Sequence, residues 1–122
     1  MISNLSLPVV LKTEKLTKRF GSLTAVQELS LEVHEGEILG FLGPNGAGKT
    51  TSISLLCGLL KPDSGEIFIH GKRLRKGSVQ NRTRVGMCPQ NIILWKLLTC
   101  IEQLEFIGEM YQIPRKIARQ RG

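Results

Sequence analysis

Residues 40–51 read Gly-Phe-Leu-Gly-Pro-Asn-Gly-Ala-Gly-Lys-Thr-Thr, and the rest of the chain is interpreted outward from them. Within this stretch, Gly43 to Thr50 fits the phosphate-loop pattern G-x-x-x-x-G-K-[ST]. Its three glycines allow backbone turns that residues with a Cβ avoid, so that successive amide N–H groups can point at a phosphate chain. A helix that follows such a loop adds its free N-terminal amides and the positive end of its dipole.

Two side chains at the end of the pattern suit the same ligand. Lys49 would supply a positive charge to the β- and γ-phosphates, and the Thr50 hydroxyl would be a ligand for Mg²⁺. The residues around the loop support this interpretation. The apolar run Glu37–Leu42 before it predicts a buried parallel strand. Apolar residues at helical spacing over Thr51–Leu60 predict a helix that ends at the turn Pro62–Gly65, so the order strand, loop, helix predicts a nucleoside-triphosphate site.

Hydrophobic patterning predicts the other elements of the chain. Further strands are predicted over residues 9–18, 24–34, 66–71 and 85–89, the last of them buried. A helix is predicted from Thr99, and Pro114 should end it. One face of that helix would be formed by Ile101, Leu104, Ile107 and Gly108.

Composition limits the class of protein. The chain has 122 residues, of which 41% are hydrophobic and 22% charged, as expected for a single globular domain. No apolar stretch approaches the roughly 18 residues that a membrane span requires, and the first residues do not resemble a signal peptide, so a cytoplasmic location is expected. The formal net charge of +7 is concentrated in residues 67–122, whose densest run is Lys72–Lys76. Such a run could bind nucleic acid or an anionic membrane surface, but without interleaved aromatic residues a solvated loop is favoured and nucleic acid is not the expected partner.

The motifs together resemble the first half of the nucleotide-binding domain of an ATP-binding-cassette (ABC) transporter. The resemblance covers residues 9–114 and depends on the order and spacing of four segments. These segments are Leu16–Gly21, Glu35–Thr51, Leu55–Ile67 and Gly86–Gln90. It implies an α/β fold: a P-loop NTPase-type core with an N-terminal antiparallel β element and the start of a helical subdomain, truncated. Residues 1–8 would be an N-terminal extension and residues 9–122 a partial domain, with the ATP-binding core to about residue 90 and the helical subdomain from 91.

The resemblance also implies roles for individual residues. Phe20 falls where the family places an aromatic residue that stacks on adenine, and a phenylalanine keeps the π-face needed for stacking. Gln90 matches the Q-loop glutamine, which reaches Mg²⁺ and the attacking water, so Lys49 and Gln90 are the expected catalytic residues and Thr50 and Gln90 the expected Mg²⁺ ligands. The expected ATP-binding residues are Phe20, Gly43, Pro44, Asn45, Gly46, Ala47, Gly48, Lys49, Thr50 and Thr51.

Several features of a complete domain are not found in this sequence. It has no Leu-Ser-Gly-Gly-Gln-type signature, no apolar strand ending in Asp-Glu and no switch histidine. The carboxylates that would hold Mg²⁺ and act as general base have no candidates, so the 122-residue chain alone is predicted not to turn over ATP. The strands expected beside the phosphate-loop strand are also missing, which would leave an open apolar edge.

The resemblance therefore predicts an ATP-binding subunit or domain of an ABC transporter, with export as the expected direction. Its expected partners are a transmembrane domain and a second nucleotide-binding domain, at the cytoplasmic face of a membrane. Three alternatives remain open from the sequence. They are a soluble ABC-type ATPase that acts on the ribosome or nucleic acid, another phosphate-loop enzyme such as a nucleotide kinase, and an inactive nucleotide-binding remnant.

Overall fold

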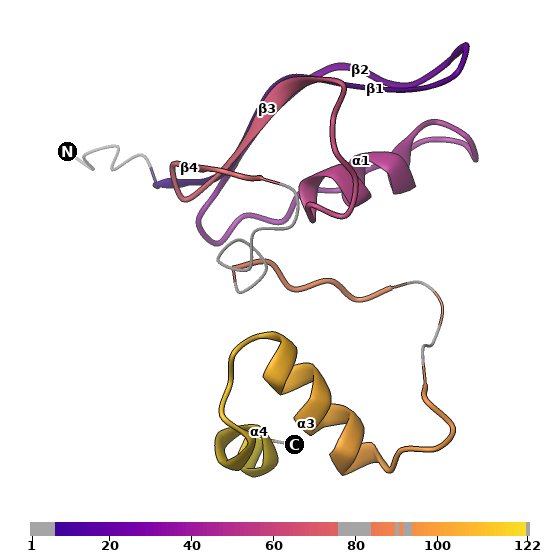
Figure 1. The fold of residues 1–122 in the computed structure, drawn as a ribbon. Coiled ribbons are helices and arrows are strands. Elements are labelled where there is room, and N and C mark those ends of the chain that lie inside the picture. The colour runs from indigo at the N-terminus through magenta and orange to yellow at the C-terminus, as the bar shows by residue number, and fades with distance from the viewer. Residues whose placement is uncertain (1–6, 76–83, 90, 92–93, 122) are drawn as a thin grey trace, which may run out of the picture. The chain divides into compact units, whose positions relative to one another are not determined.

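The computed structural model describes residues 7–75, 84–89, 91 and 94–121 (Figure 1). The chain divides into two compact units, residues 1–84 and 85–122. The described helices and strands of the first unit are a β-sheet and helix α1 (Lys49–Leu56), and those of the second are helices α3 (Cys100–Met110) and α4 (Arg115–Arg121). The predicted division into an ATP-binding core and a helical subdomain near residue 90 stays a prediction.

The first unit is built on a four-stranded antiparallel sheet with the strand order β2-β1-β3-β4. Its strands are β1 (Val9–Phe20), β2 (Leu23–His34), β3 (Ser64–Ile69) and β4 (Lys72–Arg73). A two-residue turn at Gly21 and Ser22 joins β1 to β2, so that Phe20 lies directly opposite Leu23. The three strands predicted around this hairpin and after the turn at Pro62 are confirmed, with bounds that shift by a few residues.

Helix α1 lies alongside the sheet (Figure 1), and residues of both form the hydrophobic core of this unit. Leu16 of β1 and Leu55 of α1 are fully buried, and their neighbours in the cluster are Val26, Leu56 and Ile67. Because these residues come from three strands and one helix, removing their apolar surface from water holds the helix against the sheet. The loop that leads into the helix is thereby held at the sheet as well.

Helix α1 spans Lys49–Leu56 and ends earlier than predicted. Gly58 has φ +71°, and its N–H donates to the Leu55 carbonyl at 2.9 Å. The Leu59 N–H donates to the Ser54 carbonyl, also at 2.9 Å. This pair of bonds around a left-handed glycine is the Schellman motif that ends helices. The prediction of a helix to Leu60 is wrong, because apolar spacing continues past a glycine that stops the helix.

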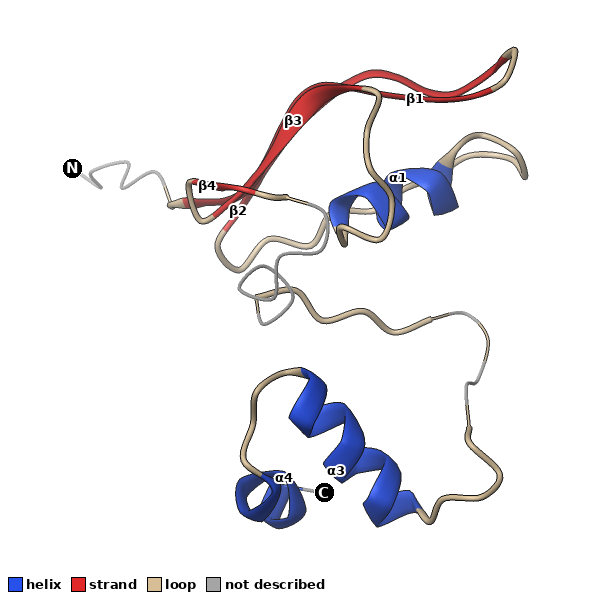
Figure 2. Ribbon diagram, in the orientation of Figure 1, coloured by secondary structure: helices blue, strands red, loops and turns tan. Residues whose placement is uncertain are grey.

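Two predicted buried strands are not formed. Residues 37–42 have no strand structure (Figure 2), and Ile38 and Leu42 are each 97% exposed. Residues 85–89 also have no strand structure, and Met87 is 42% exposed. A parallel strand needs hydrogen-bonded neighbours and cover on both faces, and the part of the chain that the structure describes contains no parallel pair. Both predictions are wrong for that reason.

The second unit contains α3 (Cys100–Met110) and α4 (Arg115–Arg121). A capping box starts α3: the Thr99 N–H donates to Glu102 Oε2 at 2.7 Å, and the Glu102 N–H donates to Thr99 Oγ1 at 3.3 Å. The Thr99 N–H, followed by its hydroxyl, lowers the pKa of the Glu102 carboxyl below its ordinary value. The predicted helix from Thr99, ending before Pro114, is confirmed.

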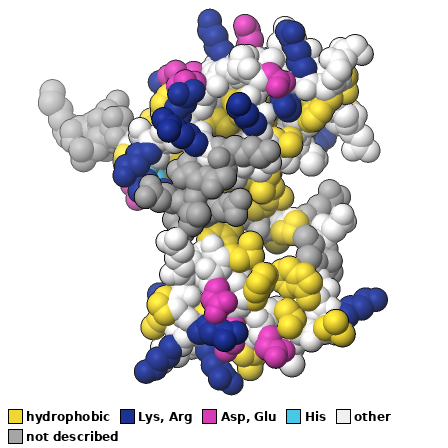
Figure 3. Space-filling view, viewed as in Figure 1, with side chains coloured by type: hydrophobic (Ala, Val, Ile, Leu, Met, Phe, Trp, Pro, Cys, Tyr) yellow, Lys and Arg dark blue, Asp and Glu magenta, His cyan; other side chains and the backbone are white. Residues whose placement is uncertain are grey.

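The two helices of this unit meet at a pair of small residues. A Cβ on Gly108 would lie 2.7 Å from the Cβ of Ala118, so α3 and α4 approach closely only because residue 108 is glycine. Other apolar residues of the predicted α3 face are only half-covered, with Ile101 49% and Leu104 45% exposed. Hydrophobic side chains are visible on the surface of this unit in Figure 3. None of the helices in the described part of the chain combines the length and apolar character needed to span a bilayer.

Candidate functional site

The glycine-rich loop joins α1 through backbone conformations that favour glycine. Gly46 and Gly48 both have φ +84°, in the left-handed region, and Gly48 is the residue that caps α1. A Cβ on Gly48 would lie 2.1 Å from the carbonyl oxygen of Ala25 in β2. The loop therefore lies directly against the β2 backbone, and this contact fixes where α1 begins.

The Lys49 side chain folds back over the loop. Its ammonium donates to the carbonyl oxygen of Pro44 at 2.8 Å and also to that of Gly43. The Ala47 N–H donates to the Pro44 carbonyl at 3.2 Å, which closes a turn inside the loop. Hydrogen bonds from an ammonium to phosphate oxygens are stronger than those to neutral carbonyls, so an anion in the loop would compete well for this side chain.

The first turn of α1 presents unpaired backbone donors. The first intrahelical bond runs from the Ser52 N–H to the Gly48 carbonyl at 2.8 Å, and no side chain in the described residues caps this end of the helix. The amides of Lys49, Thr50 and Thr51 precede that bond and so have no carbonyl of the helix to bind. These amides and the helix dipole together favour a negatively charged ligand.

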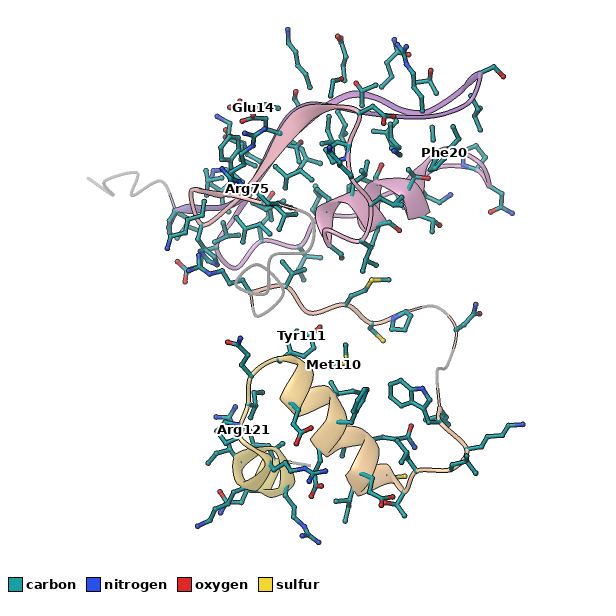
Figure 4. The ribbon with its side chains drawn as sticks, in the orientation of Figure 1. Glu14, Phe20, Arg75, Met110, Tyr111 and Arg121 are labelled. Atoms are coloured by element: carbon teal, nitrogen blue, oxygen red, sulfur yellow. The ribbon has the colours of Figure 1, made fainter. Side chains whose placement is uncertain are left out.

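A pocket of about 410 Å³ connects this loop with the end of the β1–β2 hairpin. Phe20 is 48% exposed beside it, and Figure 4 shows its side chain near the hairpin end of β1. One end of the pocket is therefore aromatic and apolar, while the other is formed by the loop and the start of α1. The residues that line it are Phe20, Leu23, Ala25, Asn45, Gly46, Gly48, Lys49, Thr50 and Thr51.

The pocket brings together most of the residues predicted to bind a nucleotide. Gly43, Pro44 and Ala47 do not line it, and the first two instead accept hydrogen bonds from Lys49. The predicted Gln90 lies outside the described residues. Two lining residues were not predicted. Leu23 could have been found from the two-residue turn, which places it opposite Phe20, whereas Ala25 depends on the packing of the loop against β2.

Fewer groups in this pocket suit a metal ion than suit a phosphate chain. Thr50 lines the pocket and is exposed, so its hydroxyl is accessible to a cation beside the loop. Within the described ranges, no group of three or more His, Cys, Asp or Glu side chains could hold a metal ion. The residues present therefore fit a phosphate chain well, and they offer Mg²⁺ one hydroxyl rather than a complete set of ligands.

A larger hollow in the first unit does not suit the same ligand. It has a volume of about 920 Å³ and runs along β1, β2 and the start of β3. Its lining includes the carboxylates of Glu14, Glu28, Glu32 and Glu66. Lys12 forms ion pairs with two of them, Glu14 at 3.1 Å and Glu32 at 3.4 Å, and these carboxylates raise the pKa of that lysine. Because carboxylates predominate there, a polyphosphate would be repelled, and the pocket at the glycine loop is the candidate site.

A family model of ABC transporters and a similar ATP-binding protein both match this chain. The family model described as "ABC transporter" matches residues 26–121 of the chain. Over 113 residues the chain is 39% identical to the linearmycin resistance ATP-binding protein LnrL of Bacillus subtilis, covering 93% of this chain and 36% of that protein. The chain thus spans little more than a third of the length of this relative.

Solved structures of ABC transporter ATP-binding proteins also resemble this chain. An ATP-binding subunit of an ABC transporter superposes with a TM-score of 0.76 at 30% sequence identity, over 84% of this chain and 42% of that one. A dimeric bacterial ABC transporter cassette superposes with a TM-score of 0.79 at 25% identity, over 91% of this chain and 53% of that one. The α/β fold with a P-loop NTPase-type core, which the family resemblance implied, is confirmed by these neighbours.

Proposed function

This chain belongs to the ABC transporter family, and on that premise we propose that it binds Mg-ATP and couples ATP binding and hydrolysis to transport across a membrane. The family provides the general activity, that of an ATP-binding ATPase domain. The proposal for this chain rests on the pocket that joins Phe20 to the glycine loop and the start of α1.

The arrangement of that pocket matches the two parts of the nucleotide. The half-exposed Phe20 ring offers a flat apolar surface for a base, with Leu23 beside it. The open amides of α1, with the Lys49 ammonium, offer the positive charge that a triphosphate needs. We assign adenine to the first end, and the phosphates to the second.

Mg²⁺ would be held by Thr50 and by Gln90, with Lys49 and Gln90 serving the phosphoryl transfer. When bound, the metal would neutralise charge on the β- and γ-phosphates. The described residues supply Lys49 and Thr50 for these roles. Since the sequence offers no carboxylate candidate for the metal or for the attacking water, we expect this chain alone to bind ATP without turning it over.

The relatives support a proposal for the partners and for the direction of transport. ABC ATP-binding domains work with transmembrane domains and dimerise, and one solved neighbour is described as dimeric. We propose both kinds of partner for this chain, at the cytoplasmic face of a membrane. The relative LnrL is named for resistance to linearmycin, which favours export over import.

The experiment that tests the site is a calorimetric titration of Mg-ATP into the wild-type chain and into Lys49→Ala. Hydrogen bonds to charged groups contribute about 1.5–3 kcal/mol each, so loss of the ammonium should weaken binding by at least about tenfold. Lys72→Ala is the matched control, because Lys72 lies on β4 and does not line the pocket. Unchanged affinity in Lys49→Ala would refute the assignment of the site.

A further inference from the structure

The C-terminal end of β1, which includes Phe20, extends beyond the end of its pairing with β3. The β1–β3 pairing reaches Thr17, which lies opposite Ser64, the first residue of β3. From Lys18 to Phe20, the only partner strand in the described residues is β2. A backbone N–H on the unpaired side still needs an acceptor, and without one this end of the strand would be free to move.

Asp63, the residue before β3, supplies that acceptor. Its Oδ2 accepts from the Arg19 N–H at 2.7 Å, and its own N–H donates to the Thr17 carbonyl at 2.9 Å. The carboxylate thus continues the hydrogen-bonding of β3 one step further along β1. The Arg19 N–H, and secondarily the Lys18 ammonium, lower the pKa of the Asp63 carboxyl, so it is ionised at neutral pH.

The second oxygen of Asp63 reaches Phe20 through Lys18. Asp63 Oδ1 accepts from Lys18 Nζ at 3.1 Å, and the same ammonium lies 5.5 Å from the centroid of the Phe20 ring. The Lys18 side chain is only 16% exposed, so its position is well defined by its surroundings. An ammonium within about 6 Å of an aromatic centroid is attracted to the ring face, and this attraction favours one orientation of the ring.

From these contacts we propose that Asp63 is a positioning residue for recognition of the base, acting through Arg19 and Lys18 to hold Phe20 in place. The inference rests on the proposed function, since it assumes that Phe20 stacks on the base of ATP. Asp63 lies after α1, on the chain that continues from the phosphate loop. The same carboxylate therefore links the strand that meets the base to the segment following the helix that meets the phosphates.

The exposure of Asp63 indicates that its main role is to position Phe20 and not to stabilise the folded chain. Its side chain is 47% exposed, and exposed ion pairs contribute little to stability. Loss of the carboxylate should therefore disorder the Phe20 ring more than it destabilises the folded chain. That change should weaken the binding of ATP and leave the binding of a ligand without a base unaffected.

The test compares Mg-ATP with magnesium tripolyphosphate, a ligand with the phosphates and no base, in calorimetric titrations of the full chain. In Asp63→Ala, the Kd for ATP should rise about three- to tenfold, since cation–π and aromatic stacking contacts are of that strength, with the Kd for tripolyphosphate unchanged. Lys18→Met should give the same selective loss while keeping the Asp63–Arg19 bond, and it decides the matter if Asp63→Ala fails to fold. The control is Glu66→Ala, which removes a carboxylate paired with Arg73 at 2.6 Å on the neighbouring strand and should affect neither ligand.

The possible outcomes are distinct. An equal loss for both ligands in the variants, or no loss for ATP, would overturn the role of Asp63 and leave the nucleotide site intact. Wild-type chain that binds tripolyphosphate as tightly as ATP would show that no base is recognised, and would also overturn it. Wild-type chain that binds neither ligand would refute the proposed function itself, and the positioning role with it.

Discussion

A Cβ placed on Gly48 would lie 2.1 Å from the carbonyl oxygen of Ala25, closer than any real Cβ contact. Gly48 caps α1, and Ala25 belongs to β2, so this single close contact places the start of α1 against the sheet. Glycine is required here for two reasons, its φ of +84° and the absence of room for a side chain. Gly46 has the same φ, with no atom within 4 Å of an added Cβ.

These two glycines provide a matched pair of substitutions. Gly46→Ala should cost only the left-handed backbone strain, about 1–2 kcal/mol of unfolding free energy. Gly48→Ala should cost the same strain plus about 1–3 kcal/mol for displacing the β2 backbone, and should weaken ATP binding because α1 moves. Chemical denaturation of both variants would measure the difference. Equal stability of the two would show that the loop is not held against Ala25.

A second prediction concerns the chemistry of the ring at residue 20. Phe20→Tyr should bind Mg-ATP within about twofold of the wild type, because the π-face is kept. Phe20→Ala should weaken ATP binding by about tenfold and leave tripolyphosphate binding unchanged. Phe106→Ala serves as control, since Phe106 is 44% exposed on α3 and contacts Trp95 rather than the pocket. If tyrosine binds as weakly as alanine, stacking is not the role of this position.

Part of the fold could be predicted from residues that are close together in the sequence. Strands close to β1 and β2 were predicted because the apolar patterns of both are visible in the sequence, and the structure joins them through the two-residue turn at Gly21 and Ser22. The start of α3 at Thr99 follows from a capping box contained within four residues. In both places the residues that determine the structure are close together in the chain.

Other features depend on partners that are distant in the sequence. Residues 37–42 have the composition of a buried strand, yet a parallel strand forms only between neighbours that the described chain does not provide. Residues 85–89 form no strand for the same reason.

In the site, the glycine loop was evident from its motif. The contact of Asp63 with Arg19, by contrast, joins residues 44 positions apart and has no local signature. Gly58 is a local signal for the end of α1, although the apolar spacing that predicts the helix continues beyond it.

The contribution of the Asp63 carboxylate should be measurable in the pH dependence of the unfolding free energy. The pKa of Asp63 is lowered in the folded chain, chiefly by the Arg19 N–H and then by Lys18. Its stabilising contribution is therefore fully present above the unfolded pKa of about 4, and it is lost as the pH falls through the lower, folded value. Because the Asp63 side chain is half-exposed, the unfolding free energies of wild type and Asp63→Asn should differ only slightly at pH 7, and they should converge in acid below that range. A difference that stays constant as the pH falls would contradict this linkage.

The contact between α3 and α4 gives the last prediction, because Gly108 and Ala118 leave no room for another methyl group. Gly108 is buried and has no positive φ, so Gly108→Ala adds a clash at 2.7 Å without backbone strain. We expect a loss of about 1–3 kcal/mol in the stability of the helical pair, measured by circular dichroism during denaturation. Adding Ala118→Gly should recover part of that loss by removing the opposing Cβ, although glycine inside α4 itself costs about 1 kcal/mol. Strict additivity of the two changes would show that these residues do not touch, since only residues in contact couple in a double-mutant cycle.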